Sequence, residues 1–393
     1  MKIKPQSFFL CVLAIIFISV PILTATGSHS SISFYEQRSL ASFPELTLDT
    51  ILDGSFFTKI DSFLSDHFCE RDKILKSDTY LNLLLKKPNV NGLVVNSDVL
   101  VDFYNYSYWD LSYLESDSAE IAKKYSNIKA LIESYGGYFC YLGLPLQSTY
   151  FSDKYPEYLD NRLWHTTAIR ESFEKAMDAE SVPFINMYEI YSQLEFPQEY
   201  YFATDHHFSL RGAFVAYSTL LNHLNLNTKW SFTDYEVSDF EFQTLENPFL
   251  GSSNRKLYGL WDNSDHLEIA YPRKKISFTR VDNGTTVQAN LHLLPSNSTE
   301  EVTYSVYMGG DIGETIINTH RPEFPNILIY GDSFTNPIET LLWTQANELR
   351  CVDFRYYTEK SLSDYILSYH PDIVICVRDE TTYLTAEGNG ITE

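Results

Sequence analysis

Basic residues are scarce in this sequence. It has 29 Lys and Arg against 52 Asp and Glu in 393 residues, which gives a formal net charge of −23. The acidic excess is spread along the chain and not collected in a tail. Nucleic acids and anionic membrane surfaces attract basic proteins, so this balance excludes both as expected partners.

Cysteine is also scarce, with five residues and neither a CxxC motif nor a zinc-ligand spacing. Four of them follow the apolar amino end, at Cys69, Cys140, Cys351 and Cys376. The last three lie in apolar runs typical of core strands. Disulfides remain open for an exported chain, while the absence of a close-spaced pair favours buried free thiols.

Charge is absent from Ser7 to Ala25, a mostly apolar run of 19 residues that follows Lys2 and Lys4. This length is at the low end for a membrane span and long for a signal-peptide core. With lysines on the short side, the positive-inside rule places the tail in the cytoplasm and the rest outside. The sequence therefore predicts a signal anchor over residues 1–26; cleavage at Ala25-Thr26-Gly27, giving a secreted protein, is the alternative.

The remainder predicts a helical segment over residues 27–89 and an α/β domain over 90–393. Leu48 to Lys86 indicates two helices broken near Cys69. From Val90 onwards, apolar strands alternate with amphipathic helices, which is typical of a mainly parallel sheet with helices on both faces. The expected strands are 92–95, 99–101, 138–144, 183–187, 327–330, 351–354 and 373–377, and the expected helices are 121–135, 165–181, 337–349 and 359–369. Alternating residues within 228–322 predict an antiparallel β-rich insertion.

Two short stretches carry the expected chemistry. Asp205 and His207 precede a helix that Ser209 can cap, and in an extended loop they project to the same side. Ser333 follows the apolar run 326–330 and precedes a helix, so it lies where open α/β sheets hold their active sites. These positions predict a triad in which Asp205 orients His207, and His207 activates Ser333.

Alternatives remain open at each position. His206 could replace His207 if the loop twists, and Asp-His-His alone could supply metal ligands, although no third ligand at a recognisable spacing stands out. No metal or cofactor is therefore expected. The N–H of Ser333 is the expected oxyanion donor because it lies at a helix start, with Gly309-Gly310 or Gly92 as the source of a second donor.

Both stretches also resemble the motifs of a known family. Gly331-Asp332-Ser333-Phe334 is similar to the nucleophile block of the SGNH hydrolase-like superfamily, and Thr204 to Phe208 resembles the motif that names the DHHW family. Those proteins are relatives of the periplasmic alginate O-acetylation proteins. Further matches lie at Glu36, Arg38 to Pro44, Asp66 to Phe68, Arg71-Asp72 and Val352 to Tyr357. The sequence departs from the pattern at Phe208, where the motif has Trp, and no carbohydrate-binding module is expected after Glu393.

The resemblance implies an SGNH-like three-layer α/β/α fold and assigns Asp205, His207 and Ser333 to the triad. It implies transfer of an acetyl group to a hydroxyl of an exported polysaccharide through an acetyl-serine, with the acetyl group delivered through a membrane-bound O-acyltransferase. An SGNH-type acetylesterase and a non-catalytic glycan-binding or assembly protein are the alternatives. From their places beside the triad and the strand ends, Arg355, Tyr201 with Tyr200, and His206 are candidate substrate contacts. A structural ion pair for Arg355 and a core position for the tyrosines are the alternatives.

Overall fold

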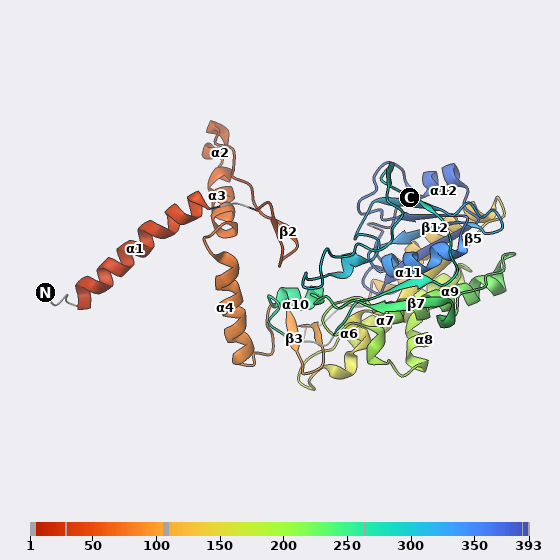
Figure 1. Cartoon of the computed structure of the whole chain (residues 1–393), viewed down its shortest axis with the longest axis horizontal. Helices are drawn as coiled ribbons and strands as arrows, with labels where there is room; N and C mark the ends of the chain where they lie inside the picture. Colours follow the sequence, from red (N-terminus) through yellow and green to blue (C-terminus); the bar gives the residue numbers. More distant parts are fainter. Residues whose placement is uncertain (1–4, 28–29, 105–109, 263–264, 387, 392–393) are drawn as a thin grey trace. The chain divides into compact units, whose positions relative to one another are not determined.

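The computed structural model of the chain describes residues 5–27, 30–104, 110–262, 265–386 and 388–391. It divides into two compact units, whose elements are labelled in Figure 1. The first unit comprises Met1–Asn91 and Asn254–Asp262, and the second comprises Gly92–Ser253 and Asn263–Glu393. The lysines at positions 2 and 4, which orient the predicted anchor, lie outside the described residues.

The first unit is mainly helical. Its elements are α1 (Pro5–Thr26), β1 (Ile32–Ser33), β2 (Arg38–Ser39), α2 (Leu48–Leu52), α3 (Ser55–Asp66) and α4 (Arg71–Leu84). The break near Cys69 lies where the sequence predicts it. The prediction of two helices over 48–86 was wrong, because Gly54 adopts a positive φ of 79° and separates α2 from α3, so α2, α3 and α4 occupy this stretch. Within the described part of the chain, no helix has both the length and the apolar character that a membrane span requires. The predicted anchor is therefore not confirmed.

Charged residues of the first unit form a compact network. Arg38 donates to both carboxylate oxygens of Asp66 at 2.9 and 2.5 Å, and Arg71 pairs with Glu36 at 2.9 Å. The hydrogen bond from Arg38 holds the pKa of Asp66 well below its usual range. His67 ends α3, and its Nε2 lies 2.8 Å from the carbonyl oxygen of Ala41. These residues thus hold the α3–α4 junction together.

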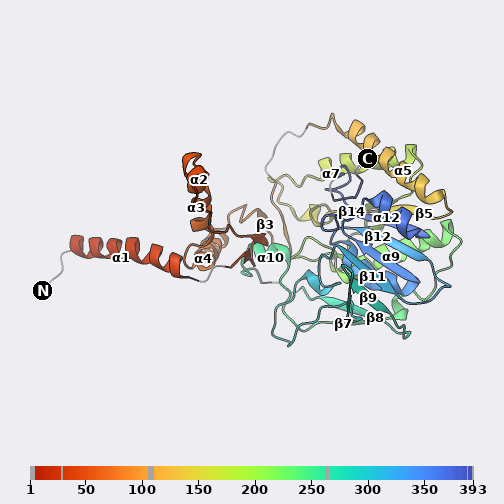
Figure 2. The ribbon, with the colours of Figure 1, turned by 90° about the horizontal axis from the view of Figure 1, so that it is seen from above.

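The second unit is built on an eight-stranded sheet with the order β10-β9-β11-β13-β12-β14-β5-β6. The strands are β5 (Tyr138–Leu144), β6 (Phe184–Asn186), β9 (Thr279–Asp282), β10 (Thr285–Val287), β11 (Glu314–Asn318), β12 (Asn326–Gly331), β13 (Glu348–Val352) and β14 (Ile373–Asp379). Strands β13, β12, β14, β5 and β6 run parallel, while β11, β9 and β10 add an antiparallel edge. Figure 2 shows β14, β12, β11 and β9 in this order across the sheet, and the unlabelled β13 lies between β12 and β11.

Alternate residues of the central strands enter two separate cores. Ile327, Ile329 and their neighbours face α9 (Leu210–Asn227) and α11 (Thr335–Leu342), whereas Leu328 and Tyr330 face α5 (Leu114–Glu133), α7 (Leu163–Ala179) and α12 (Leu362–Tyr369). Because side chains of a strand alternate between its faces, one apolar run fills both cores. The predicted mixed α/β fold with helices on both faces of a mainly parallel sheet is confirmed.

Three details differ from the sequence predictions. The runs at 92–95 and 99–101 form a separate antiparallel pair, β3 (Leu93–Val95) and β4 (Leu100–Asp102), and do not join the large sheet. The helix expected over 337–349 ends at Leu342. Residues 348–352 form β13, which pairs with β11 on one side and β12 on the other, and so do not continue the helix. The insertion is antiparallel, as expected, but only β7 (Phe240–Thr244) and β8 (Glu268–Pro272) form a sheet of their own, while β9 to β11 extend the main sheet.

Candidate active site

The loop before α9 carries Asp205 and His207. Ser209 caps α9 by accepting the N–H of Gly212 at 3.2 Å, as its sequence position predicts. The loop closes on itself through the N–H of Phe202, which donates to the carbonyl oxygen of His207 at 3.3 Å. A short closed loop at a helix start leaves few conformations open to the two side chains, which fixes their direction.

The turn that carries Ser333 joins β12 to α11. Gly331 ends the strand, and a Cβ at this position would lie 2.4 Å from the carbonyl oxygen of Val377 and 2.6 Å from Cγ2 of Thr335. Only glycine lets β14 and α11 approach the turn this closely. Asp332 then accepts the N–H of Phe334 at 3.0 Å, which fixes the turn around Ser333.

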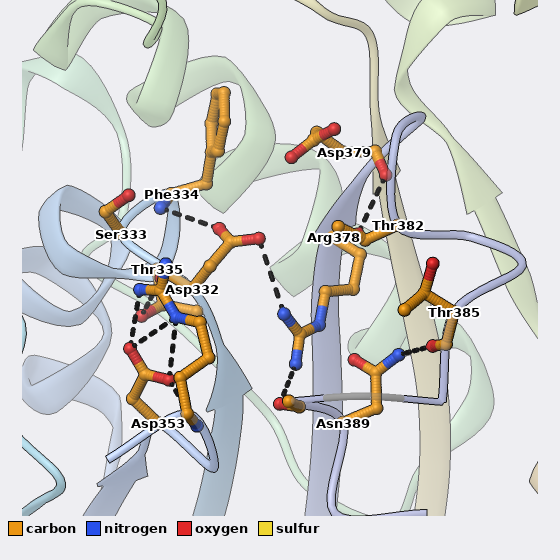
Figure 3. Close-up of polar contacts among 12 residues, drawn as sticks. Asp332, Ser333, Phe334, Thr335, Asp353, Arg378, Asp379, Thr382, Thr385 and Asn389 are labelled. Carbon is orange, nitrogen blue, oxygen red and sulfur yellow. Dashed lines mark hydrogen bonds and ion pairs between the residues drawn. The ribbon is translucent and has the colours of Figure 1, made fainter. Parts of the chain in front are cut away.

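A buried arginine supports the turn from the neighbouring strand. Nη1 of Arg378, on β14, lies 3.5 Å from Oδ2 of Asp332, and its Nη2 donates to the carbonyl oxygen of Gly388. Figure 3 shows Asp332 between the start of α11 and Arg378, with the hydroxyl of Ser333 directed away from that pair. Arg378 therefore links the serine turn to the carboxyl-terminal segment.

The structure brings the three predicted triad residues together. Nδ1 of His207 lies 2.6 Å from Oδ1 of Asp205, and its Nε2 lies 2.7 Å from Oγ of Ser333. Nδ1–H can donate to the carboxylate while Nε2 accepts the serine hydroxyl, which is the arrangement of a general base with its orienting group. His206 does not take this place: its Nδ1 lies 2.7 Å from Oγ of Ser252.

Asp205 is held as an ionised acceptor. Its Oδ1 also accepts the N–H of His207 at 3.1 Å, and its Oδ2 accepts the N–H of Ser252 at 2.6 Å. Burial opposes its ionisation, but the charge and hydrogen bond of His207, together with His206 and the N–H of Ser252, hold its pKa well below the usual range. The carboxylate thus stays charged beside the imidazole.

Two residues of the insertion support this loop and were not found from the sequence. Ser252 supplies the N–H to Asp205, and Asp265 accepts the N–H groups of Ala203 and Thr204 at 3.2 and 2.8 Å. They follow the loop by 47 and 61 residues, and no sequence motif marks them. Gly251, next to Ser252, packs closely against the loop: a Cβ at this position would lie 2.3 Å from the carbonyl oxygen of Thr204.

The two predicted oxyanion donors have different surroundings. No hydrogen-bond acceptor is found for the N–H of Ser333 among the residues that the structure describes, so this group can face a ligand. The N–H of Gly310 donates to the carbonyl oxygen of Tyr307 at 3.1 Å. The choice of Gly310 was therefore wrong, because its N–H is already used in a turn.

The predicted substrate contacts lie in different environments. Arg355 follows β13, donates to Asp353 at 2.6 Å and pairs with Asp311 at 3.2 Å, so its guanidinium is held by two carboxylates while remaining 37% exposed. The structure places Tyr201 in the core, 2% exposed, with its hydroxyl donating to the carbonyl oxygen of Pro145 at 2.6 Å. Tyr201 thus has the core position that the sequence left as the alternative, because its place in the chain does not show which face it takes.

Tyr200 and His206 are more accessible. Tyr200 lines a cavity of about 640 Å³, whose wall also includes Glu199, Arg211 and Glu268. The His206 side chain is 53% exposed. Their roles in substrate binding stay predictions.

Asp205, His206 and His207 also lie close enough for one ligand atom of each to fall within 4.8 Å of the others. A metal held there would need a ring nitrogen of His207. Both of those nitrogens already face hydrogen-bond partners, Asp205 and Ser333. The geometry therefore fits the triad better than a metal centre.

The comparisons with known proteins agree with the fold. Residues 36–132 match the family model described as DHHW protein, which confirms the resemblance expected from the sequence. This match covers the network of Arg38 and Asp66 and ends before Asp205 and Ser333. The comparison with curated proteins found no match.

Solved structures share the architecture. The chain is similar to Bacillus cereus PatB1 with sulfonyl adduct, at a TM-score of 0.62 and 19% identity over 74% of this chain and 95% of that one. It is also similar to a DHHW family protein from Eubacterium siraeum, at a TM-score of 0.57 and 18% identity over 77% and 95%. A more distant likeness is to the O-acetyltransferase domain of Pseudomonas putida AlgJ, with a TM-score of 0.46 and 11% identity over 75% and 92%. The first two likenesses show a common fold.

Proposed function

We propose that this chain is a serine-dependent O-acetyltransferase that moves an acetyl group to a hydroxyl of an exported or cell-surface polysaccharide. The observation that carries the proposal is the unbroken relay from Asp205 through His207 to Ser333, with separations of 2.6 and 2.7 Å. A serine hydroxyl is a weak nucleophile at neutral pH and needs such a base. The choice of acetyl group and polysaccharide follows from the resemblance of the two motifs to the SGNH hydrolase-like superfamily and to the DHHW family, whose relatives are the periplasmic alginate O-acetylation proteins.

In the first half-reaction, Oγ of Ser333 attacks the acetyl carbonyl while Nε2 of His207 takes the hydroxyl proton. Asp205 accepts Nδ1–H throughout and stabilises the imidazolium that forms. The N–H of Ser333 lies at the positive end of α11 and is placed to hold the developing oxyanion. Collapse of the intermediate breaks the bond to the donor oxygen, which takes the proton from His207 and leaves acetyl-Ser333.

In the second half-reaction, a sugar hydroxyl gives its proton to Nε2 of His207 and attacks acetyl-Ser333. The bond between the acetyl carbon and Oγ breaks, and the imidazolium returns its proton to Ser333. Water can replace the sugar in the same step. An acetylesterase therefore uses the same relay, and only the acceptor separates the two activities.

We propose that the reaction takes place outside the cytoplasm, on a chain anchored through its amino end. The uncharged run from Ser7 to Ala25 and the lysines before it support this placement. A membrane-bound O-acyltransferase would supply the acetyl group on the outer side, as the family resemblance implies. Protease protection in membrane vesicles tests the orientation: residues after Thr26 should be digested from the outer side alone.

The first test is intact mass of the full chain in detergent after incubation with a chromogenic acetyl ester. We expect a gain of one acetyl group on Ser333, absent in Ser333→Ala and strongly slowed in His207→Ala. A sulfonyl fluoride is a second probe, chosen because the PatB1 structure carries a sulfonyl adduct, and it should modify the same serine. Each variant should keep the thermal transition of the wild type.

Acceptors are then added to the acetylated chain. Acetyl groups recovered on an oligosaccharide would support transfer, while release of acetate alone would support the esterase. Absence of both an adduct and ester turnover in a folded wild type would contradict the proposal and favour a glycan-binding protein.

A further inference from the structure

An aromatic ring lies flat against the imidazole of His207. The centroids of the Tyr304 and His207 rings are 3.9 Å apart and their planes differ by 6°. Tyr304 begins a short 3₁₀ turn, η4 (Tyr304–Val306), in the insertion and is 6% exposed. The family motifs do not include this position, which follows His207 by almost one hundred residues.

Other groups also face this imidazole. The His206 ring lies 3.7 Å away with a 38° tilt, and the Phe334 ring lies 4.8 Å away. Two rings this close cannot share one face of an imidazole, so His206 and Tyr304 take opposite faces. Asp205 meets the ring edge at Nδ1, and the carboxylate of Asp311 is close enough to interact with a charge on His207.

The hydroxyl of Tyr304 has no evident task. Within the described part of the chain it is buried and has no hydrogen-bond partner. Burial holds the pKa of Tyr304 well above its usual range, so the side chain remains a neutral phenol. A buried hydroxyl without a partner stabilises nothing, so the ring itself is the part of Tyr304 that can act on His207.

We propose that Tyr304 is a positioning residue whose ring face holds His207 in line with Ser333 and stabilises the imidazolium that forms during proton transfer. This inference rests on the proposed function, in which His207 is the base. The face of an aromatic ring is negative and attracts a cation centred over it. The imidazolium exists only after the proton has moved from Ser333 to His207. The attraction therefore lowers the barrier to this proton transfer and leaves substrate binding unchanged.

The inference predicts different effects on turnover for two substitutions of Tyr304. Tyr304→Phe keeps the ring and removes the unpartnered hydroxyl, so turnover and stability should match or exceed those of the wild type. Tyr304→Leu removes the ring face, so kcat should fall about 2- to 30-fold with KM unchanged. A purely structural role would give losses in proportion to stability in both variants.

The pH profile gives a second readout. Without the ring face the imidazolium is less stable relative to the neutral imidazole. The acid limb of the rate profile should therefore move to lower pH in Tyr304→Leu, by about half a unit to one and a half units. His206 is kept in every protein compared, so its ring acts on the imidazole of His207 equally in each.

The experiment compares wild type, Tyr304→Phe, Tyr304→Leu and Tyr304→Met in rate of acetylation of Ser333 and in acid-limb position. Met has no aromatic face and is flexible, so it tests the ring in case Leu folds poorly. Tyr217→Leu is the matched control, because Tyr217 is buried with no exposed surface and lies on α9. It should lose stability without moving the acid limb.

The outcomes are distinct. Absence of both an adduct on Ser333 and ester turnover in the wild type would refute the proposed function; the protonation of His207, followed by NMR against pH in the same four proteins, would still test the ring. An active wild type whose profile coincides with those of Tyr304→Leu and Tyr304→Met would overturn the inference. Equal losses in Tyr304→Phe and Tyr304→Leu would overturn it as well, because they would assign the effect to the hydroxyl.

Discussion

Asp205→Asn is the substitution that tests the relay most sharply. The carboxylate accepts three N–H groups: Nδ1 of His207 at 2.6 Å, the backbone of His207 at 3.1 Å and the backbone of Ser252 at 2.6 Å. They divide between its two oxygens, with both His207 groups on Oδ1 and Ser252 on Oδ2. The side-chain amide of Asn has one oxygen and one NH₂ group. Its NH₂ group must therefore face either Nδ1 of His207 or the backbone N–H of Ser252.

If the NH₂ group faces Nδ1, the imidazole takes the tautomer with its proton on Nε2 and can no longer accept the proton of Ser333. From comparable substitutions in serine hydrolases, kcat should fall about ten-thousand-fold. If the NH₂ group faces Ser252 instead, a buried N–H loses its acceptor, at a cost of about 1–3 kcal/mol in the free energy of unfolding. At least one of these losses must appear.

The assay measures acetylation of Ser333 by rapid-quench mass spectrometry and stability by urea unfolding. Asp265→Asn is the matched control, because Asp265 accepts backbone N–H groups of the same loop without contacting the imidazole. It should lower stability and leave the rate within about tenfold, as expected of a group that acts on the loop alone. Asp205→Asn with both rate and stability near those of the wild type would refute the reasoning.

Three further predictions concern groups near the site. Burial raises the pKa of Glu339 on α11 from 4.5 to about 7. Its contribution to the free energy of unfolding is therefore full below about pH 4.5 and is lost as the pH rises through 7. In urea unfolding, the wild type should lose on the order of 3 kcal/mol between pH 4.5 and 8, and Glu339→Gln should not show this loss. Gly331→Ala should lower the melting temperature and abolish acetylation of Ser333, because the added Cβ meets the carbonyl oxygen of Val377 at 2.4 Å, and a melting temperature near that of the wild type would contradict the close packing. Tyr201→Phe removes a donor to Pro145 in the core and should cost about 1 kcal/mol in urea unfolding with KM unchanged, whereas a raised KM would restore it as a substrate contact.

The sequence predicts the parts of the site that depend on local pattern. Asp205 and His207 are two residues apart, so an extended loop brings them to one side, and Ser333 follows a buried strand that identifies its end of the sheet. The parallel strands are long apolar runs bounded by turns, which is the strongest signal that a sequence offers for them. Strands β5, β6, β12 and β14 were placed correctly because short-range geometry decides them, whereas β13 occupies 348–352 and not the expected 351–354.

The remainder depends on packing between distant segments. The residues of β3 and β4 are as apolar as those of the large sheet, and periodicity does not tell which strand they pair with. Tyr201 and Tyr200 are adjacent and of one type, yet only Tyr201 turns into the core. Ser252 and Tyr304 reach the triad from the insertion, whose path over the loop no local rule describes.

The order of the strands has a consequence for synthesis of the chain. β12, which ends at the turn of Ser333, lies between β13 and β14, and both follow it in the sequence. β14 also joins β12 to β5, near the start of the unit. A chain emerging from the ribosome amino end first therefore contains Asp205 and His207 long before the strands on both sides of β12 have been made. β12 has both neighbours only when residues up to Asp379 have joined the sheet, so under the proposed function a chain truncated before β14 should not be acetylated on Ser333.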